Sequence, residues 1–120
     1  MIPTLRKTDI EQIHVAAKLL SDNLRYRTTI PMLATKLMMP EKKLKAGFRK
    51  EYKMGVYAYL KKMRMEKAKD LLLSGRSVKE VSWEVGYKEE SAFIKAFKSI
   101  EGDSPAAWLR EVENSQPKTA

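Results

Sequence analysis

The sequence predicts an all-α fold of about seven helices, in which two helix-turn-helix subdomains are joined by a long linker helix. Apolar residues recur every three or four positions along the chain, as in helices. No stretch long enough for a strand alternates apolar and polar residues. A pattern of short helix, turn and longer helix occurs twice, 48 residues apart. The 120 residues, 43% of them apolar, suffice for one compact domain and leave no room for a separate ligand-sensing domain.

The first predicted helix covers residues 9–24 and follows an N-terminal segment of residues 1–8. Asp9 is its expected N-cap, because a carboxylate there can accept from the unpaired amides of the first turn. The apolar residues form one face, so we expect a packing helix. They are Ile10, Ile13, Ala17, Leu20 and Leu24.

The first helix-turn-helix unit completes a subdomain of residues 9–55. Its short helix covers 30–37, with Pro31 in the first turn, where a missing N–H costs nothing. Its recognition helix covers about 41–53 and ends before Gly55. The residues between the two helices are Met38, Met39 and Pro40, and those expected to face inward are Ile30, Leu33, Ala34, Leu37, Leu44 and Phe48.

The linker helix is predicted over residues 56–73, a length of about 27 Å at 1.5 Å per residue. Ser74 and Gly75 end it. Its apolar residues are Tyr59, Leu60, Met63, Ala68, Leu71 and Leu72. Arg64 has two interpretations, an ion pair with Asp or Glu that fixes the subdomains or a contact with phosphate, and we favour the first.

The second subdomain covers residues 74–113. Ser77 begins a capping box in which Glu80 can reach back to the Ser77 amide. A recognition helix at about 89–101 follows, and a last helix then begins with Ser104 as N-cap and a proline in its first turn. The residues expected to be buried are Val78, Val81, Val85, Phe93, Phe97, Ile100, Trp108, Leu109 and Val112, and we expect a disordered tail over 114–120.

The two copies of the repeat align residue by residue, Thr29–Met38 with Ser77–Gly86. Small Ala34 falls on small Ser82, as close approach of the two helices of such a unit requires. Gly86 can adopt the left-handed backbone of the turn, whereas Met38 is poorly suited to it. We therefore expect a wider or mildly strained first turn.

This duplicated unit predicts binding to double-stranded DNA. A helix fits the B-DNA major groove, which is about 12 Å wide, and adjacent grooves on one face recur every ~34 Å. A linker helix of roughly 27 Å can set two recognition helices at such a separation. A fold of this kind is called homeodomain-like.

The net charge of +9 indicates an anionic partner, such as nucleic acid. Residues 40–69 hold eleven basic and three acidic groups, a balance of +8, whereas residues 70–110 hold six basic and seven acidic groups. We expect the first subdomain to supply most of the salt-dependent affinity. The alternative function is a basic helical module that binds an anionic membrane surface or a protein partner, which would explain the lysines but not the repeat.

Composition excludes other classes. The chain has no cysteine and one histidine, His14, so we expect no enzyme, no metal site and no cofactor. It has neither a signal sequence nor the ~20 apolar residues of a membrane span, so we expect a cytoplasmic protein with no membrane partner. The methionines, including Met38, Met39 and Met63, are interpreted as core filler.

Residues 86–98, Gly-Tyr-Lys-Glu-Glu-Ser-Ala-Phe-Ile-Lys-Ala-Phe-Lys, with Gly-Asp-Ser-Pro at 102–105 and Trp108, resemble the signature of the AraC/XylS family of bacterial transcription regulators. Residues 59–72 resemble the linker helix of that family. The resemblance covers roughly residues 9–110. It implies seven helices, binding to adjacent major grooves at promoters, RNA polymerase as a partner and no small-molecule ligand in this domain. An activator is expected, although the sequence itself leaves both activation and repression open.

The sequence departs from the family pattern in its first half more than in its second. Met39 stands where the family has a serine or threonine N-cap, Lys53 where it has glycine, and Ser82 where it has alanine. An AraC-like domain is usually accompanied by a sensing or dimerisation domain, so the chain is either a complete small regulator or a fragment of a longer protein.

The resemblance also assigns candidate DNA contacts. In the first recognition helix Lys42, Lys45 and Ala46 correspond to base-contacting positions, with Lys43, Arg49 and Lys50 nearer phosphates. The second recognition helix would present Glu90, Ser91, Ala92, Ile94 and Lys95. A solvated surface is the alternative for the lysines, and stabilisation of the helix dipole is an equally good one for Glu89 and Glu90.

Overall fold

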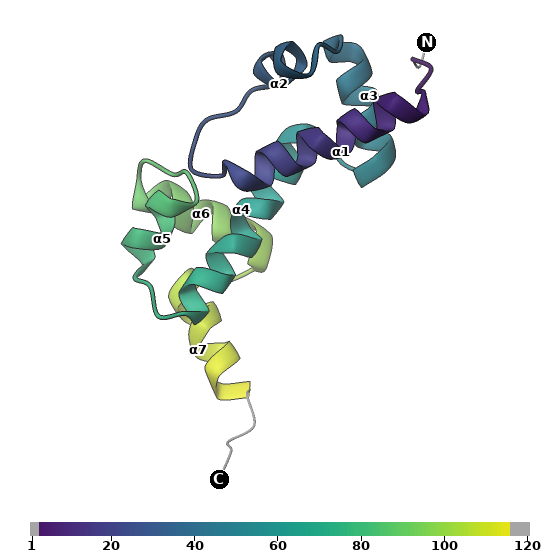
Figure 1. Cartoon of the computed structure of the whole chain (residues 1–120). Coiled ribbons are helices and arrows are strands. Elements are labelled where there is room, and N and C mark those ends of the chain that lie inside the picture. The colour runs from purple at the N-terminus through teal and green to yellow at the C-terminus, as the bar shows by residue number, and fades with distance from the viewer. Residues whose placement is uncertain (1–2, 116–120) are drawn as a thin grey trace. The chain divides into compact units, whose positions relative to one another are not determined.

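The computed structural model describes residues 3–115, and these contain seven helices and no strand (Figure 1). The helices are α1 (Lys7–Asp22), α2 (Ile30–Leu37), α3 (Glu41–Tyr52), α4 (Val56–Leu73), α5 (Val78–Glu84), α6 (Glu90–Glu101) and α7 (Pro105–Ser115). The all-α prediction is confirmed. No helix in the described part of the chain is both long and apolar enough to cross a bilayer.

The chain divides between Arg64 and Met65 into two compact units, each with its own apolar core. This boundary falls inside α4. Val56 and Leu60 of α4 are buried in the core of the first unit, while Met65, Ala68 and Leu72 are buried in the core of the second. The predicted linker helix is therefore also a core element of both units.

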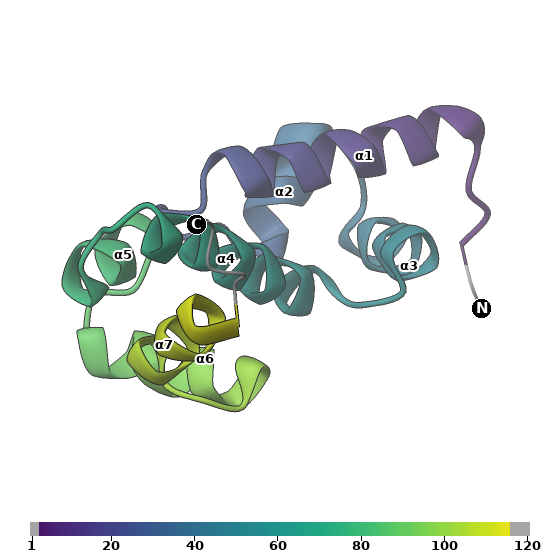
Figure 2. The same cartoon turned by 90° about the horizontal axis from the view of Figure 1, so that it is seen from below.

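In the first unit α1 packs against both α2 and α3 (Figure 2). Gly47 permits the close approach of α3 to α1, because a Cβ at that position would lie 2.8 Å from two side-chain carbons of the fully buried Ile13. Arg64 donates hydrogen bonds to the backbone carbonyls of Leu24 and Tyr26, at 3.1 and 3.5 Å. The favoured prediction was an ion pair with Asp or Glu, whereas these two bonds are made to carbonyl groups. They give Arg64 a structural role, in which it holds the loop that leads into α2.

In the second unit α6 packs against α5 and α7, and the fully buried Phe93 and Phe97 of α6 form the centre of the core. Lys69 on α4 forms ion pairs with Glu66, at 3.2 Å, and with Glu101 at the end of α6, at 3.1 Å. Burial opposes the charged form of Lys69, but the bonds to the two carboxylates outweigh it and raise the pKa of its ammonium group. The ion pairs therefore tie α4 to α6.

Several predicted details of the elements are wrong. Helix α1 starts and ends two residues earlier than expected, so Leu24 lies beyond it. Asp9 lies at the third helical position, where its carboxylate accepts from the Arg6 amide at 2.8 Å. Ile100 is 44% exposed, because it lies in the last turn of α6, beyond the phenylalanine face. Met38 is 92% exposed, and is therefore not core filler, whereas Met39 is buried.

The chain termini also differ from expectation where they are described. Helix α7 extends to Ser115, so residues 114 and 115 of the predicted disordered tail are helical. Residues 116–120 of that tail, and residues 1–2 of the N-terminal segment, lie outside the described residues.

Candidate nucleic-acid interface

The turn of the first helix-turn-helix unit closes with two backbone hydrogen bonds. The amide of Met39 donates to the carbonyl of Ala34 at 3.0 Å, and the amide of Met38 donates to that of Thr35 at 3.2 Å. Met38 has φ 54° and ψ 43°, in the left-handed region. Of the two outcomes expected for this turn, the structure has the strained one, because a side chain is crowded in this conformation.

The turn of the second unit has the same hydrogen bonds 48 residues further on. The amide of Tyr87 donates to the carbonyl of Ser82 at 2.9 Å, and the amide of Gly86 donates to that of Trp83 at 3.1 Å. Gly86 has φ 97°, which glycine adopts without steric cost. The repeat found in the sequence is thus a repeat of backbone geometry, and both turns are of the Schellman type.

Both short helices also begin alike. The Thr29 hydroxyl oxygen accepts from the Met32 amide at 3.3 Å, and the Ser77 hydroxyl oxygen accepts from the Glu80 amide at 3.1 Å. The Glu80 carboxylate accepts from the Ser77 hydroxyl at 3.0 Å, whereas the predicted capping box paired it with the Ser77 amide. These caps satisfy amides at the start of each helix-turn-helix unit.

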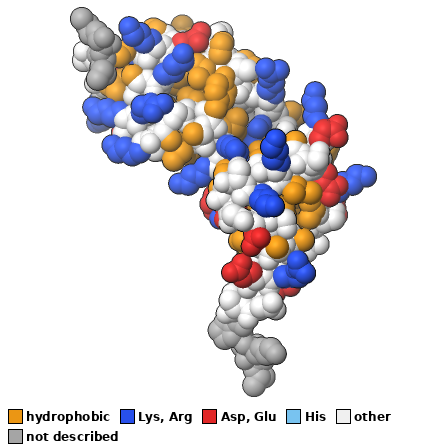
Figure 3. All heavy atoms as spheres, turned by 180° about the vertical axis from the view of Figure 1, so that it is seen from behind, with side chains coloured by type: hydrophobic (Ala, Val, Ile, Leu, Met, Phe, Trp, Pro, Cys, Tyr) orange, Lys and Arg blue, Asp and Glu red, His pale blue; other side chains and the backbone are white. Residues whose placement is uncertain are grey.

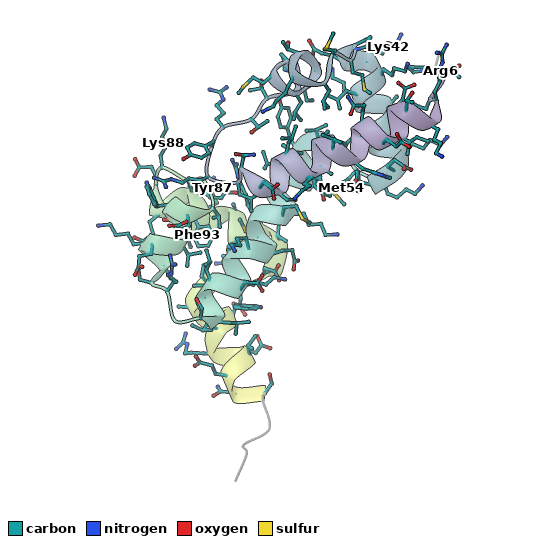
Figure 4. The ribbon with its side chains drawn as sticks, in the orientation of Figure 1. Arg6, Lys42, Met54, Tyr87, Lys88 and Phe93 are labelled. Atoms are coloured by element: carbon teal, nitrogen blue, oxygen red, sulfur yellow. The ribbon has the colours of Figure 1, made fainter. Side chains whose placement is uncertain are left out.

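Helix α3 presents a row of cations to solvent. Lys42, Lys45, Arg49 and Lys50 are exposed, and Ala46 between them is half-buried. These four cationic side chains form no ion pair with any carboxylate of residues 3–115. Lys42 extends from the first turn of α3, away from the helices (Figure 4). Uncompensated positive charge on one helical face is suited to a polyanion.

Lys43 lies apart from that row. Its ammonium group forms an ion pair with Asp9 of α1 at 2.9 Å, and the two side chains are only 27% and 16% exposed. The bond from the Arg6 amide, followed by the bond from Lys43, lowers the pKa of the Asp9 carboxyl. Lys43 thus links α1 to α3, and its ammonium group is already paired.

Helix α6 presents a nearly neutral surface. Glu90, Ser91, Ala92 and Lys95 are exposed, while Ile94 is half-buried and packs against the core. Helix α6 begins at Glu90, and Glu89 is its N-cap residue without a side-chain cap bond. Both carboxylates therefore lie at the positive end of the helix dipole. This position is compatible with a contact to DNA and with stabilisation of the helix dipole.

An open hollow of about 500 Å³ adjoins the start of α6. Trp83 of α5, which is 51% exposed, and Tyr87 line it together with charged side chains of both signs. Tyr87 and Lys88 lie on the turn between α5 and α6 (Figure 4). Sequence reasoning missed Trp83 as a surface residue, although its position off the valine face of α5 was a usable signal.

The charge asymmetry predicted from the sequence is visible on the surface. On the face in Figure 3, lysine and arginine side chains gather near the N-terminal end, and most of the carboxylates lie nearer the C-terminal end. Two helix-turn-helix units whose turns share the same backbone hydrogen bonds thus carry different charges.

Comparison with known proteins, like the geometry of the two turns, identifies a helix-turn-helix domain. Residues 33–111 match a protein family described as "Helix-turn-helix domain". The chain is 33% identical over 84 residues to the Msm operon regulatory protein of Streptococcus mutans, an alignment that covers 69% of this chain and 30% of that protein. The chain therefore spans about a third of the length of this curated relative.

Solved structures share the fold. The C-terminal domain of AraT, a response regulator from Geobacillus stearothermophilus, has a TM-score of 0.79 and 28% identity, with 83% of this chain and 84% of that chain covered. The DNA-binding domain of AdpA, solved in complex with a target DNA, has a TM-score of 0.80 at 23% identity, with 90% and 98% covered. At that identity the second likeness shows the fold alone.

Proposed function

The chain belongs to the AraC/XylS family of helix-turn-helix DNA-binding domains, and we propose that it binds specific sequences of double-stranded DNA by placing α3 and α6 in adjacent major grooves. One observation carries this proposal. The two units share the same turn, and in each of them the helix that follows the turn exposes the face opposite to its buried aromatic residues. A duplicated pair of recognition helices is the architecture that reads two grooves.

In the first unit, Lys42, Lys45 and Ala46 face base edges, and Arg49 and Lys50 face phosphates. Their exposure and the lack of acidic partners for the four cations support these roles. Lysine donates to guanine O6 and N7 but lacks the fixed fork of arginine, so base discrimination by α3 is modest. Lys43 contributes to this interface by positioning α3, since it is paired with Asp9.

In the second unit, Glu90, Ser91, Ala92 and Lys95 face base edges, with Ile94 at the margin of the exposed face. Glu90 can accept from cytosine N4, and Ala92 and Ile94 can contact a thymine methyl group. Their exposure or partial exposure on α6 supports these roles. The near-neutral charge of α6 means that this unit adds selectivity more than general affinity for phosphate.

For the whole protein we propose a bacterial transcription regulator that acts in the cytoplasm, recruits RNA polymerase and activates its target promoters. The curated relatives that the chain matches include operon regulators, such as the raffinose operon regulatory protein of Pediococcus pentosaceus. The proposal includes no membrane partner and no small-molecule ligand of this domain. No catalytic activity is proposed.

Selection of bound duplexes from a random pool tests the proposed function. We expect an enriched site with two conserved blocks whose centres are one helical turn apart, about 10–10.5 base pairs. A single block would show that only one groove is read.

A competition experiment separates DNA binding from the alternative. At physiological salt the chain should shift the selected duplex at concentrations where it does not sediment with vesicles that contain anionic lipid. A chain that binds vesicles but enriches no duplex from the pool is a membrane-surface module, and the proposed function is then rejected.

A further inference from the structure

A hollow of about 290 Å³ lies in the first unit, where the end of α3 meets the starts of α2 and α4. We call it the α3–α4 hollow. No carboxylate lines it, and its lining residues are Ile30, Lys45, Arg49, Gly55, Val56, Tyr57 and Ala58. A hollow lined by two cations and no anion is suited to an anionic group.

The side chains in the hollow are arranged as donors. Arg49 extends over the turn between α3 and α4, because one of its terminal nitrogens would lie 3.5 Å from a Cβ added to Gly55. Arg49 and Lys45 are exposed and form no ion pair within residues 3–115. The guanidinium group is therefore free to donate to an oxyanion, for which its planar fork is well suited.

Tyr57 adds a neutral donor from α4. Its phenolic oxygen accepts from the Ile30 amide at 2.9 Å, and the hydroxyl proton remains available to donate to a second acceptor. The Tyr57 side chain is 51% exposed, so a ligand can reach the hydroxyl group. The bond to Ile30 fixes the position of the hydroxyl beside the helix-turn-helix unit.

We propose that the α3–α4 hollow holds one phosphate of the DNA backbone at the edge of the major groove that α3 reads, with Arg49 and Tyr57 as its donors. This inference rests on the proposed function. Lys45, which we propose to face base edges, also lines the hollow, so the hollow adjoins the base-facing part of α3. A phosphate held there would fix the register of α3 along the duplex, because phosphate contacts position a recognition helix while base contacts specify the sequence.

Phosphate neutralisation tests the proposal. In the selected duplex, each phosphate near the first block is replaced in turn by an uncharged methylphosphonate. We expect one position at which this replacement weakens binding by about tenfold, since a charge-assisted hydrogen bond is lost. Arg49→Ala should weaken binding to the unmodified duplex about tenfold and abolish the penalty at that position.

Tyr57→Phe separates a phosphate contact from a merely structural role. We expect a loss of about threefold on the unmodified duplex, and a smaller loss on the duplex with the critical methylphosphonate. If Tyr57 acted only by stabilising α2, both duplexes would lose affinity equally. Thermal unfolding of each variant shows whether it is folded at the assay temperature.

Lys18→Ala is the matched control, because it removes one positive charge from α1 of the same unit and lies outside the hollow. It should keep the full methylphosphonate penalty. The inference is overturned if no position shows a penalty, or if Arg49→Ala keeps it in full. Saturable binding of inorganic phosphate with a Kd near 1 mM or lower, without any methylphosphonate effect, would assign the hollow to a small anion instead.

The same experiment distinguishes this inference from the proposed function. If the chain enriches a duplex from the random pool but shows no Arg49-dependent phosphate position, the proposed function stands and the hollow is not a phosphate site. If the chain enriches no duplex at all, both fail.

Discussion

Met38 carries the backbone strain of the first helix-turn-helix unit. Its φ of 54° is in the left-handed region, and its side chain, 92% exposed, contributes little packing. Met38→Gly should raise the free energy of unfolding by about 0.5–1 kcal/mol, because relief of the strain exceeds the greater chain entropy of glycine in the unfolded state. Urea denaturation, analysed with an unchanged m-value, measures this difference.

The equivalent residue of the second unit provides the reciprocal variant. Gly86 has φ 97°, so Gly86→Ala should lower the free energy of unfolding by about 1 kcal/mol or more. If Gly86→Ala loses stability as expected but Met38→Gly also loses stability, the first turn stores no strain.

Lys43 illustrates which part of the site a sequence predicts. Helical spacing placed Lys42, Lys45 and Arg49 on one face, and all three are exposed. The same spacing gives no information about Asp9, which lies 34 positions earlier in the chain and pairs with Lys43. Contacts between helices depend on their packing, so the pairing of Lys43 and the placement of Tyr57 beside Ile30 required the structure.

At the scale of elements, the Lys43–Asp9 ion pair joins α1 to α3, and we expect it to make their contact sensitive to acid. The bond from the Arg6 amide and the bond from Lys43 lower the pKa of the Asp9 carboxyl below its ordinary value. The stability that this carboxylate contributes is therefore fully present above the unfolded-state pKa and is lost as the pH falls through the folded-state pKa. Asp9→Asn should lose stability at neutral pH, and the difference from the unmodified protein should shrink below about pH 4.

Urea denaturation at a series of pH values from neutral to acid measures this effect. Asp22→Asn is the control, since the Lys18–Asp22 pair lies within α1 on exposed side chains and such pairs contribute little. An Asp9→Asn deficit that is the same at neutral pH and at acid pH would show that the carboxylate charge does not support the α1–α3 contact.

The helices themselves were largely predictable, for a physical reason. Helices α2 and α4 have the predicted bounds. Local backbone preferences explain this, because Pro31 lies in the first turn of α2, while Gly55 precedes α4 and Gly75 follows it. The predicted start of α1 was wrong. A carboxylate can satisfy amides at a helix start both from the N-cap and from the third helical position, and Asp9 lies at the third position. Local chemistry thus predicts that a helix starts nearby, but not the turn in which it starts.

At the scale of the whole molecule, one backbone motif is used twice with different surface chemistry. The first unit exposes Lys42, Lys45, Arg49 and Lys50 on α3, whereas the exposed face of α6 combines Glu90 with Lys95. Each unit has a separate core, and α4 contributes to both. The surface of one recognition helix can therefore differ from that of the other without any change in the core that positions it.

This division of charge predicts that the two units respond differently to salt. Lys42→Ala should clearly reduce the slope of log affinity against log salt, because it removes one of the uncompensated cations of α3. Lys95→Ala should change the slope less, because residues 70–110 hold six basic and seven acidic groups and attract phosphate only weakly as a whole. Titration of the selected duplex between 50 and 200 mM salt, roughly the range over which such slopes are resolved, measures both. Equal reductions in the two variants would show that both units bind DNA with the same electrostatic contribution, and that the charge asymmetry of the chain has no counterpart in its affinity.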